Sequence, residues 1–327
     1  MKKITVFGAK NALATTITGP LDFFSLVGSQ WNYQCGINPS PYFNVELTTV
    51  DGKPIHFFNN LVVQPHNKIE DIESTDLIIL PCIAGFIEES LEELHPVYPW
   101  LWHHFKKGTY ILGICSGAFL MAEAGLLDEK LATTHWSYHE QFVNRYPDVK
   151  LDTNQLLTRD GNLFCAGGTT AWMNLCLYLI KIFYGREVAI ECSKVLVLRM
   201  SITAQTPFSP LMRPSNHNDP EIQSIQDWLE AHFYEPFTIE HLSNRVNMCA
   251  RNFKRRFKEA TGFPPITYLQ MIRVEEAKKL LEQKNYNVDE IAVNIGYEDS
   301  SFFRKIFKRY TGLSPKSYQK LFTIEEI

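Results

Sequence analysis

The sequence lacks the features that would place it in a membrane or in a secretory pathway. No apolar run reaches membrane length: the most apolar stretch, residues 171–183, is too short to span a bilayer and carries Lys181. The amino terminus begins with lysines, but Gly8 to Asn11 interrupt the apolar residues before a signal-peptide core develops. We therefore expect a cytoplasmic protein that has no contact with a membrane.

Cysteine pairs with disulfide or metal-site spacing are also missing. None of the seven cysteines forms a Cys-x-x-Cys motif, and they are scattered over positions 35, 82, 115, 165, 176, 192 and 249. This scatter argues against a disulfide scaffold and against a structural zinc site. We expect reduced thiols, no bound metal and no cofactor.

A strong net charge is absent as well, but the charge is unevenly distributed along the chain. The formal charge is −4, yet the part from Glu221 onward carries 16 Lys and Arg against 15 Asp and Glu, and the part before it carries 16 against 21. The cations of the last part are concentrated in two short segments. A local patch of cations, rather than the total charge, attracts nucleic-acid phosphates.

A chain of 327 residues exceeds what one hydrophobic core usually supports, so two domains are expected. In residues 1–200, strand and helix patterns alternate, which favours an α/β domain with a parallel sheet. The strands are predicted at 4–7, 76–80 and 110–114, and the helices include 88–104, 117–124 and 171–184.

A linker is expected at residues 201–220, because four prolines between 203 and 220 cannot sustain a helix or a strand. After the linker the pattern is helical to the end of the chain. We therefore predict an all-α domain over residues 221–323.

The strongest pattern in the sequence is an internal repeat within this second domain. Residues 251–258, RNFKRRFK, and residues 301–308, SFFRKIFK, are each followed by Thr-Gly, Pro and Tyr at matching positions, offset by 50. Upstream, residues 239–242 match residues 288–291 at an offset of 49, so the intervening turn differs by one residue. Since apolar residues fall on one face of each predicted helix, the repeat predicts two helix-turn-helix motifs.

Turn and cap residues fit the same prediction. The turns carry Asn247 and Gly296, residue types that tolerate a left-handed backbone at a helix end. Gly262 and Gly312 are expected to stop the two recognition helices. Ser300 is predicted to cap the second recognition helix, whereas the equivalent position of the first holds a cysteine, a poor cap.

With the phenylalanines facing inward, the outward faces of both recognition helices are polar and cationic. Side chains near the start of such a helix reach base edges in the major groove, and the remainder meet phosphate. A helix predicted at 267–283 joins the two copies, so we expect them to enter successive major grooves of double-stranded DNA. The predicted DNA-binding residues are Arg251, Asn252, Lys254, Arg255, Lys258, Ser300, Ser301, Arg304, Lys305 and Lys308.

Residues 221–323 resemble the DNA-binding domain of the AraC/XylS family. The resemblance is carried by the two repeat segments, by Arg273, by Gly296-Tyr297, and by the TGFPP and TGLSP segments at 261–265 and 311–315. It implies sequence-specific promoter binding, usually with activation of transcription and with RNA polymerase as a partner.

In the first domain, residues 113–117, GICSG, follow a predicted strand and precede a predicted helix. A Gly-x-nucleophile-x-Gly turn holds its central side chain at a sharp corner, so Cys115 is a candidate nucleophile. The start of the following helix is expected to lower the thiol pKa of Cys115 and to favour the thiolate. His135 follows twenty positions later and offers a base or a thiolate partner.

These segments resemble the DJ-1/PfpI branch of the class I glutamine amidotransferase-like fold, and more closely the sensor half of the GlxA-type AraC regulators. The resemblance runs from Ile4 to Leu198 and implies a flavodoxin-like domain that forms a homodimer. The residues 205–208, QTPF, look like the start of the linker in that subfamily. The motifs that carry the resemblance are TGPLD at 18–22, LIILP at 77–81, GICSGAFL at 113–120, AGLLD at 124–128, ATTHW at 132–136 and AGGTTA at 166–171.

The sequence departs from the catalytic members of that family at three places. Thr16 stands where they carry an acidic residue beside the nucleophile, and Cys82 replaces the glycine whose N–H helps to form the oxyanion hole. Ser116 follows the nucleophile where the PfpI proteases have histidine. We therefore expect that the protein is not an enzyme.

Our main hypothesis is a transcription regulator whose first domain binds an unidentified small-molecule effector at a pocket formed by Thr16, Cys82, Cys115, Ser116 and His135. One alternative is a DJ-1/PfpI-like amidase or hydrolase that uses Cys115. Another is a redox sensor, because Cys82 ends the strand that adjoins the Cys115 turn and is a candidate resolving thiol. A domain that only binds another protein would explain the first domain but would leave the cationic repeat without a purpose.

Overall fold

The computed structural model describes residues 1–327 except 35, 86, 199–203, 212–216, 284–285 and 324–327. The contacts between residues divide the chain into two units, Met1–Gln205 and Thr206–Ile327. The expected linker, 201–220, is shared between them, since Gln205 belongs to the first unit and the 3₁₀ helix η3 (Thr206–Phe208) to the second. Residues 201–203 and 212–216 of that linker lie outside the described residues.

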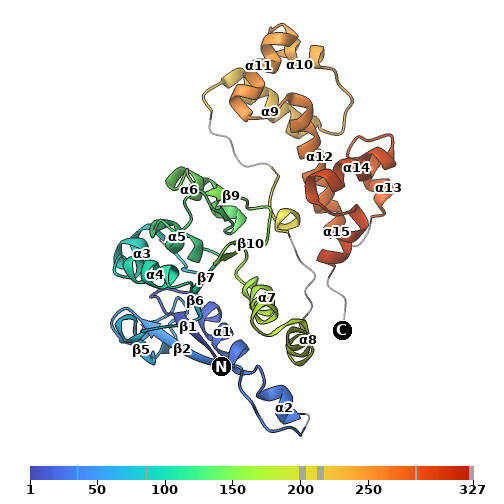
Figure 1. Ribbon diagram of the computed structural model, residues 1–327. Helices are drawn as coiled ribbons and strands as arrows, with labels where there is room; N and C mark the ends of the chain where they lie inside the picture. The colour runs from blue at the N-terminus through green and yellow to red at the C-terminus, as the bar shows by residue number, and fades with distance from the viewer. Residues whose placement is uncertain (35, 86, 199–203, 212–216, 284–285, 324–327) are drawn as a thin grey trace. The chain divides into compact units, whose positions relative to one another are not determined.

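The first unit is built on a seven-stranded sheet with the strand order β10-β11-β7-β6-β1-β2-β5 (Figure 1). All neighbouring pairs are parallel except β10 and β11, so the predicted parallel sheet is confirmed. Two short strand pairs, β3–β4 and β8–β9, lie outside this sheet. The strands are β1 (Lys2–Phe7), β2 (Phe43–Thr49), β3 (Ile55–His56), β4 (Val62–Val63), β5 (Asn67–Lys68), β6 (Leu77–Leu80), β7 (Tyr110–Ile114), β8 (Leu131–Ala132), β9 (Lys150–Leu151), β10 (Leu157–Asp160) and β11 (Leu163–Ala166).

Helices flank the sheet and bury its central strands. Strand β6 has no exposed residue, as expected of an apolar parallel strand that is covered on both faces. Helix α1 packs against β1, β2 and α7, whereas α5 packs against β6 and β7 beside α3 and α4. The helices of this unit are α1 (Thr15–Ser25), α2 (Gln30–Gln34), η1 (Ile69–Asp71), α3 (Ile87–Glu93), α4 (Val97–Lys106), α5 (Gly117–Glu123), η2 (Trp136–Tyr138), α6 (His139–Arg145), α7 (Trp172–Tyr184) and α8 (Arg186–Val195).

The single helix predicted over residues 88–104 is wrong. The structure forms two helices there, α3 and α4, and Pro96 occupies the N-cap position of α4. A proline disfavours helical backbone in the residue before it and has no N–H to donate, so the first helix ends ahead of it.

The second unit is all-α, as predicted, and contains two hydrophobic cores. One core includes Phe253 and Phe257, the other includes Phe303 and Phe307, and α12 contributes residues to both. The predicted joining helix over 267–283 is α12 (Pro265–Glu282). The remaining helices are α9 (Pro220–His232), α10 (Ile239–Arg245), α11 (Ala250–Thr261), α13 (Val288–Asn294), α14 (Ser300–Thr311) and α15 (Pro315–Phe322).

Within the described ranges, no helix combines the length and the apolar character that crossing a bilayer would require.

The core of the first unit contains a histidine without a hydrogen-bond partner among the described residues. His104 of α4 is completely buried, and both of its ring nitrogens are unpaired. Burial disfavours the charged imidazolium and, together with the neighbouring His103 and Lys107, lowers the pKa of His104 from 6.5 to about 4. The neutral ring therefore contributes full stability above pH 6.5, and that contribution is lost as the pH falls from 6.5 towards 4.

We predict that His104→Leu weakens the pH dependence of unfolding of the first unit. Between pH 7.5 and pH 5, the wild-type chain should lose about 2 kcal/mol of stability that the variant retains, given the depression of this pKa. Urea unfolding followed by tryptophan fluorescence at both pH values measures the difference. His56→Leu replaces an exposed histidine and is the matched control; an equal pH dependence in His104→Leu and wild type would contradict the prediction.

Candidate DNA interface and sensor elbow

The two recognition helices are α11 and α14, and each is fixed by a pair of fully buried phenylalanines. Phe253 and Phe257 lie one turn apart on α11, so both rings face the same core. As predicted, glycine ends each helix: Gly262 has φ 80° and Gly312 has φ 77°, which a side chain would strain. The opposite side of each helix is thereby turned to solvent.

On α11, four of the five predicted DNA-binding side chains are exposed, and Asn252 is half-buried. The guanidinium of Arg255 donates to Glu259 at 2.8 Å and to Asn252 at 3.0 Å. No ion pair within the described part of the chain engages the other three cations of this face, Arg251, Lys254 and Lys258.

Arg256 has a different role from its neighbours. Its guanidinium donates to Asp219 at 2.7 Å and to Glu221 at 2.9 Å. The Asp219 carboxylate also accepts the Ile222 N–H and so caps α9. Arg256 therefore ties α11 to the start of α9, which fits its absence from the predicted DNA-binding set.

On α14, Ser301, Arg304, Lys305 and Lys308 are exposed, and Ser300 is half-buried. The prediction that Ser300 caps this helix is wrong: Asp299 is the N-cap, and its carboxylate accepts the Ser301 N–H at 2.7 Å. A carboxylate at this position also interacts favourably with the positive end of the helix. Ser300 is instead the first residue of the helix, where its hydroxyl accepts from Arg304 at 3.2 Å.

Arg304 is held in place from a second helix as well. Its Nη2 donates to the carboxylate of Asp289 on α13 at 2.8 Å. The equivalent position in α11 is occupied by Lys254, for which no such partner is described, so the two recognition helices differ in how rigidly they present a cation. The repeat offset could have pointed to this contact, since Asp289 and Glu240 occupy equivalent positions, but the pairing itself was missed.

Arg273 of α12 connects the two helix-turn-helix motifs. Its guanidinium donates to the carbonyls of Phe233 at 2.7 Å and Glu235 at 3.2 Å, and it lies 5.0 Å from the centre of the Tyr297 ring. Gly296 makes this approach possible: it has φ 84°, and a Cβ there would lie 2.5 Å from the Tyr234 carbonyl oxygen. The predicted left-handed turn residues, Asn247 (φ 51°) and Gly296, are both confirmed.

In the first unit, the predicted sharp turn at residues 113–117, which we call the elbow, is formed. Cys115 has φ 55°, an unusual backbone conformation for a residue with a side chain, at the junction of β7 and α5. Gly117 allows the close packing around it, because a Cβ there would lie 2.7 Å from the Leu80 carbonyl oxygen. Cys115 itself is buried.

The backbone donors beside the elbow are already occupied by hydroxyl groups. Thr16 accepts the N–H of Cys82 at 3.1 Å and donates its own proton to the Leu13 carbonyl at 2.7 Å. Ser116 Oγ accepts the N–H of Ile83 at 2.8 Å. These two N–H groups are therefore engaged and not free to stabilise an oxyanion at Cys115.

The thiol of Cys115 is not activated. A hydrogen bond with Cys82 and burial raise the pKa of Cys115, whereas the same hydrogen bond is the main cause that lowers the pKa of Cys82 to about 6. Ser116 Oγ, 3.5 Å from Cys82 Sγ, further stabilises a thiolate on Cys82. The expected lowering of the Cys115 pKa by the start of α5 is not found, because the neighbouring Cys82 thiol and burial act in the opposite direction.

His135 lies beside the elbow but is not hydrogen-bonded to Cys115. Its Nδ1 accepts the N–H of Ser137 and lies 2.7 Å from Ser137 Oγ. Burial lowers the pKa of His135, which keeps the ring neutral. The contact to the elbow comes from the preceding residue, as Thr134 Oγ1 donates to the Cys115 carbonyl at 2.9 Å. Thr169, whose hydroxyl lies 3.9 Å from Cys115 Sγ, is a further neighbour that the sequence analysis missed.

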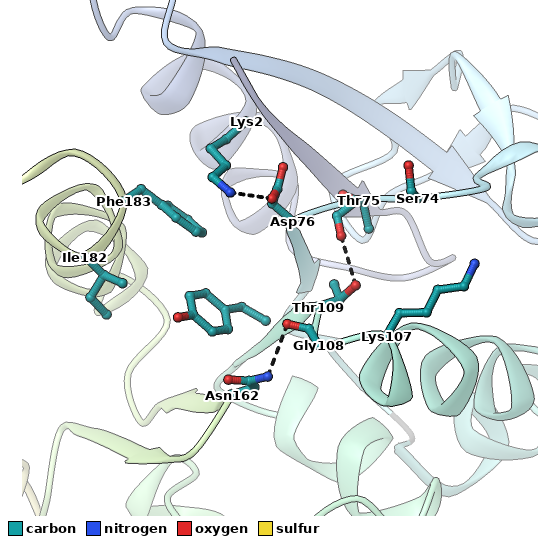
Figure 2. A pocket seen from close by; sticks show the side chains of 11 residues that line it. Lys2, Ser74, Thr75, Asp76, Lys107, Gly108, Thr109, Asn162, Ile182 and Phe183 are labelled. Atoms are coloured by element: carbon teal, nitrogen blue, oxygen red, sulfur yellow. Dashed lines mark hydrogen bonds and ion pairs between the residues drawn. The ribbon is translucent and has the colours of Figure 1, made fainter.

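A separate cleft of about 520 Å³ lies at the amino-terminal ends of β1, β6 and β7 (Figure 2). The elbow follows the carboxyl end of β7, so none of the predicted pocket residues lines this cleft. The Lys2 ammonium and the Asp76 carboxylate form an ion pair of 2.7 Å within it. Across the described residues, no cluster of three or more His, Cys, Asp or Glu is placed to hold a metal ion.

Comparisons with known proteins agree with both halves of this description. Residues 2–182 match the DJ-1/PfpI family, and residues 242–321 match a helix-turn-helix domain. The solved structure of a putative transcriptional regulator protein from Vibrio parahaemolyticus has the same fold over 60% of this chain and 98% of that chain, with a TM-score of 0.51 and 21% identity.

Three known transcriptional regulators are similar to this chain in sequence. The HTH-type transcriptional regulators GbdR and CdhR of Pseudomonas aeruginosa are 27% and 28% identical, over 82% of this chain and 72% and 79% of their own lengths. The HTH-type transcriptional activator RhaS of Salmonella schwarzengrund is 31% identical over 38% of this chain and 45% of its own length. The chain therefore belongs to the DJ-1/PfpI family, and it is a transcription regulator in which an AraC-type helix-turn-helix domain follows the DJ-1/PfpI domain.

Proposed function

We propose that the chain regulates transcription by binding promoter DNA with α11 and α14, under the control of a small molecule sensed by its first domain. The observation that carries this proposal is the pair of recognition helices, each with buried phenylalanines on one side and exposed cations on the other. Helix α12 has 18 residues and is roughly 27 Å long, which suits two recognition helices placed about one turn of DNA apart.

Within this interface we assign base reading and phosphate binding to different residues. Arg304 lies in the first turns of α14, and the Asp289 carboxylate orients its planar guanidinium, which suits bidentate recognition of a guanine. Lys305 and Lys308 are flexible and exposed, which suits phosphate contacts. In α11 we assign base reading to Arg251 and Asn252 and phosphate contacts to Lys254, Arg255 and Lys258.

We propose that the elbow region binds the effector and does not catalyse a reaction. Cys82 is hydrogen-bonded to Thr16 and to Ser116, and Thr134, the residue before His135, donates to the carbonyl of Cys115. The occupied backbone donors and the raised pKa of Cys115 are unsuited to nucleophilic catalysis. The proposed effector is a small metabolite bound next to Cys115 and His135.

By analogy with the family, we further propose that the chain acts in the cytoplasm as a homodimer and contacts RNA polymerase as an activator. Dimerisation through the first domain would place two helix-turn-helix units on paired half-sites of a promoter.

A specific observation favours a second candidate for the first domain, namely redox sensing by Cys82 and Cys115. Hydrogen bonding to Cys115 and to Ser116 lowers the pKa of Cys82 to about 6, which favours reaction of Cys82 with an oxidant. Treatment with peroxide followed by mass spectrometry tests this candidate: a mass loss of two hydrogens on the peptides that carry both cysteines supports it, and unmodified thiols exclude it.

We predict that Arg304→Ala weakens binding to DNA from the gene's own upstream region by about 1–3 kcal/mol and relaxes sequence preference. Lys308→Ala should weaken binding to that DNA and to random DNA equally, and should reduce the salt dependence by about one phosphate contact. Fluorescence anisotropy over a series of salt concentrations measures both effects. Equal losses on specific and random DNA for Arg304→Ala would show a phosphate contact instead of base reading.

We predict that Cys115→Ala reduces effector affinity at least about tenfold, because the substitution removes the thiol from the proposed binding site. Isothermal titration of the full chain against a panel of amino acids, sugars and carboxylic acids first identifies the ligand. Cys176→Ala, a buried cysteine of α7, is the matched control. Unchanged affinity in Cys115→Ala would remove the elbow from the sensing mechanism.

A further inference from the structure

The side chain of Gln205 is buried in the first unit, although the second unit begins at the next residue. Its amide nitrogen donates to the carbonyls of Thr134 at 2.9 Å and Gln155 at 3.0 Å, and to Thr133 Oγ1 at 3.2 Å. Its amide oxygen accepts the N–H of Trp136 at 3.2 Å. Both ends of one primary amide are therefore bound by groups of matching polarity.

The shape of this site is as specific as its polarity. A Cβ on Gly167 would lie 2.0 Å from the Gln205 amide nitrogen, so only glycine leaves room for the amide. The backbone is tied down as well, since Gln205 N–H donates to the Asn154 carbonyl at 2.8 Å. Gln205 is thus docked by its side chain and by its main chain.

The segments that bind Gln205 also form the walls of the elbow. Thr134, whose carbonyl accepts from Gln205, donates its hydroxyl to the Cys115 carbonyl. Ala166, next to Gly167, accepts the Cys115 N–H at 2.7 Å, and Thr169 lies against the Cys115 thiol. A displacement of residues 133–136 or 166–169 at the elbow therefore reaches the Gln205 amide directly.

On the other side of Gln205, the chain is anchored almost at once to the second unit. The Phe208 ring lies 5.4 Å from that of Phe322, and the Ser209 carbonyl accepts from Lys278 at 2.9 Å. Leu211 N–H donates to the Glu275 carboxylate at 2.6 Å. Only Thr206 and Pro207 separate the docked glutamine from these contacts, and a proline has little freedom to absorb a movement.

We propose that Gln205 is a latch: its buried amide links the elbow to the helix-turn-helix unit, and a change at the elbow releases the amide and alters DNA binding. This inference rests on the proposed function for its DNA readout. The latch has two states, docked and released, and the hydrogen bonds to the amide set the balance between them.

Hydrogen exchange of the full chain, read by mass spectrometry, tests the latch without a known effector. Gly167→Ala expels the amide and Thr134→Val breaks the contact to Cys115, while neither changes the linker sequence. Both should raise exchange in peptides covering residues 204–211 by about fivefold, since each lost hydrogen bond shifts a local opening equilibrium by about that factor. Gln205→Ala should do the same, and Gln64→Ala, an exposed glutamine of the first unit, is the matched control.

The same variants are then compared for binding to the upstream DNA by anisotropy. The latch predicts that Gly167→Ala and Gln205→Ala shift Kd in the same direction by at least about threefold, and that Gln64→Ala does not. Raised exchange with an unchanged Kd, or unchanged exchange at 204–211, overturns the proposal. If wild type binds no DNA, the proposed function fails. In that case the latch is tested by hydrogen exchange in the α12 peptides around Glu275 and Lys278. A rise in these peptides in the variants supports the latch, and a rise confined to the first unit overturns it.

Discussion

Burial of two phenylalanine rings on one side of each recognition helix is the constraint on which the DNA-binding unit depends. With Phe253 and Phe257 in one core and Phe303 and Phe307 in the other, neither helix can rotate without exposing aromatic surface. The cations on the opposite sides are presented to solvent as a consequence. Because α12 contributes to both cores, and Arg273 binds carbonyl groups on one side and the Tyr297 ring on the other, the spacing of the two readers is part of the fold.

The first domain keeps a sharp turn at Cys115 and surrounds it with hydroxyl groups. The backbone at Cys115 retains a costly positive φ, of order 1–3 kcal/mol, because the surrounding sheet and helix determine it. The hydroxyls of Thr16 and Ser116 meanwhile consume the N–H groups of Cys82 and Ile83. The result is a buried corner of the molecule in which the side chains of Thr16, Cys82, Cys115 and Ser116 have little access to solvent.

Local patterns explain how much of this structure could be predicted from the sequence. The repeat, its glycine stops and the strands β1, β6 and β7 are marked by patterns of neighbouring residues and were predicted, whereas β2 and β11 were not. The missed features depend on residues far apart: Thr16 meets Cys82 across 66 positions, and Gln205 meets Thr133 across 72. The predicted direction of the Cys115 pKa shift was wrong for the same reason, because the shift depends mainly on a second thiol and on burial. The helix break at Pro96 and the N-cap at Asp299 have local causes, a proline and a side-chain carboxylate, although neither was predicted.

The tethering of residues 205–211 bears on how such regulators are recombined, in evolution or in the laboratory. The Gln205 amide packs against Gly167 and donates to three oxygen acceptors of the first domain. Ser209 and Leu211 form hydrogen bonds with a lysine and a glutamate of the second domain. A hybrid protein whose residues 205–211 come from a different regulator than the adjoining domain would lack the residues that bind this segment. When the first domains of two such regulators are exchanged, function is therefore expected to survive only if the two sequences are joined at Thr206 or Pro207.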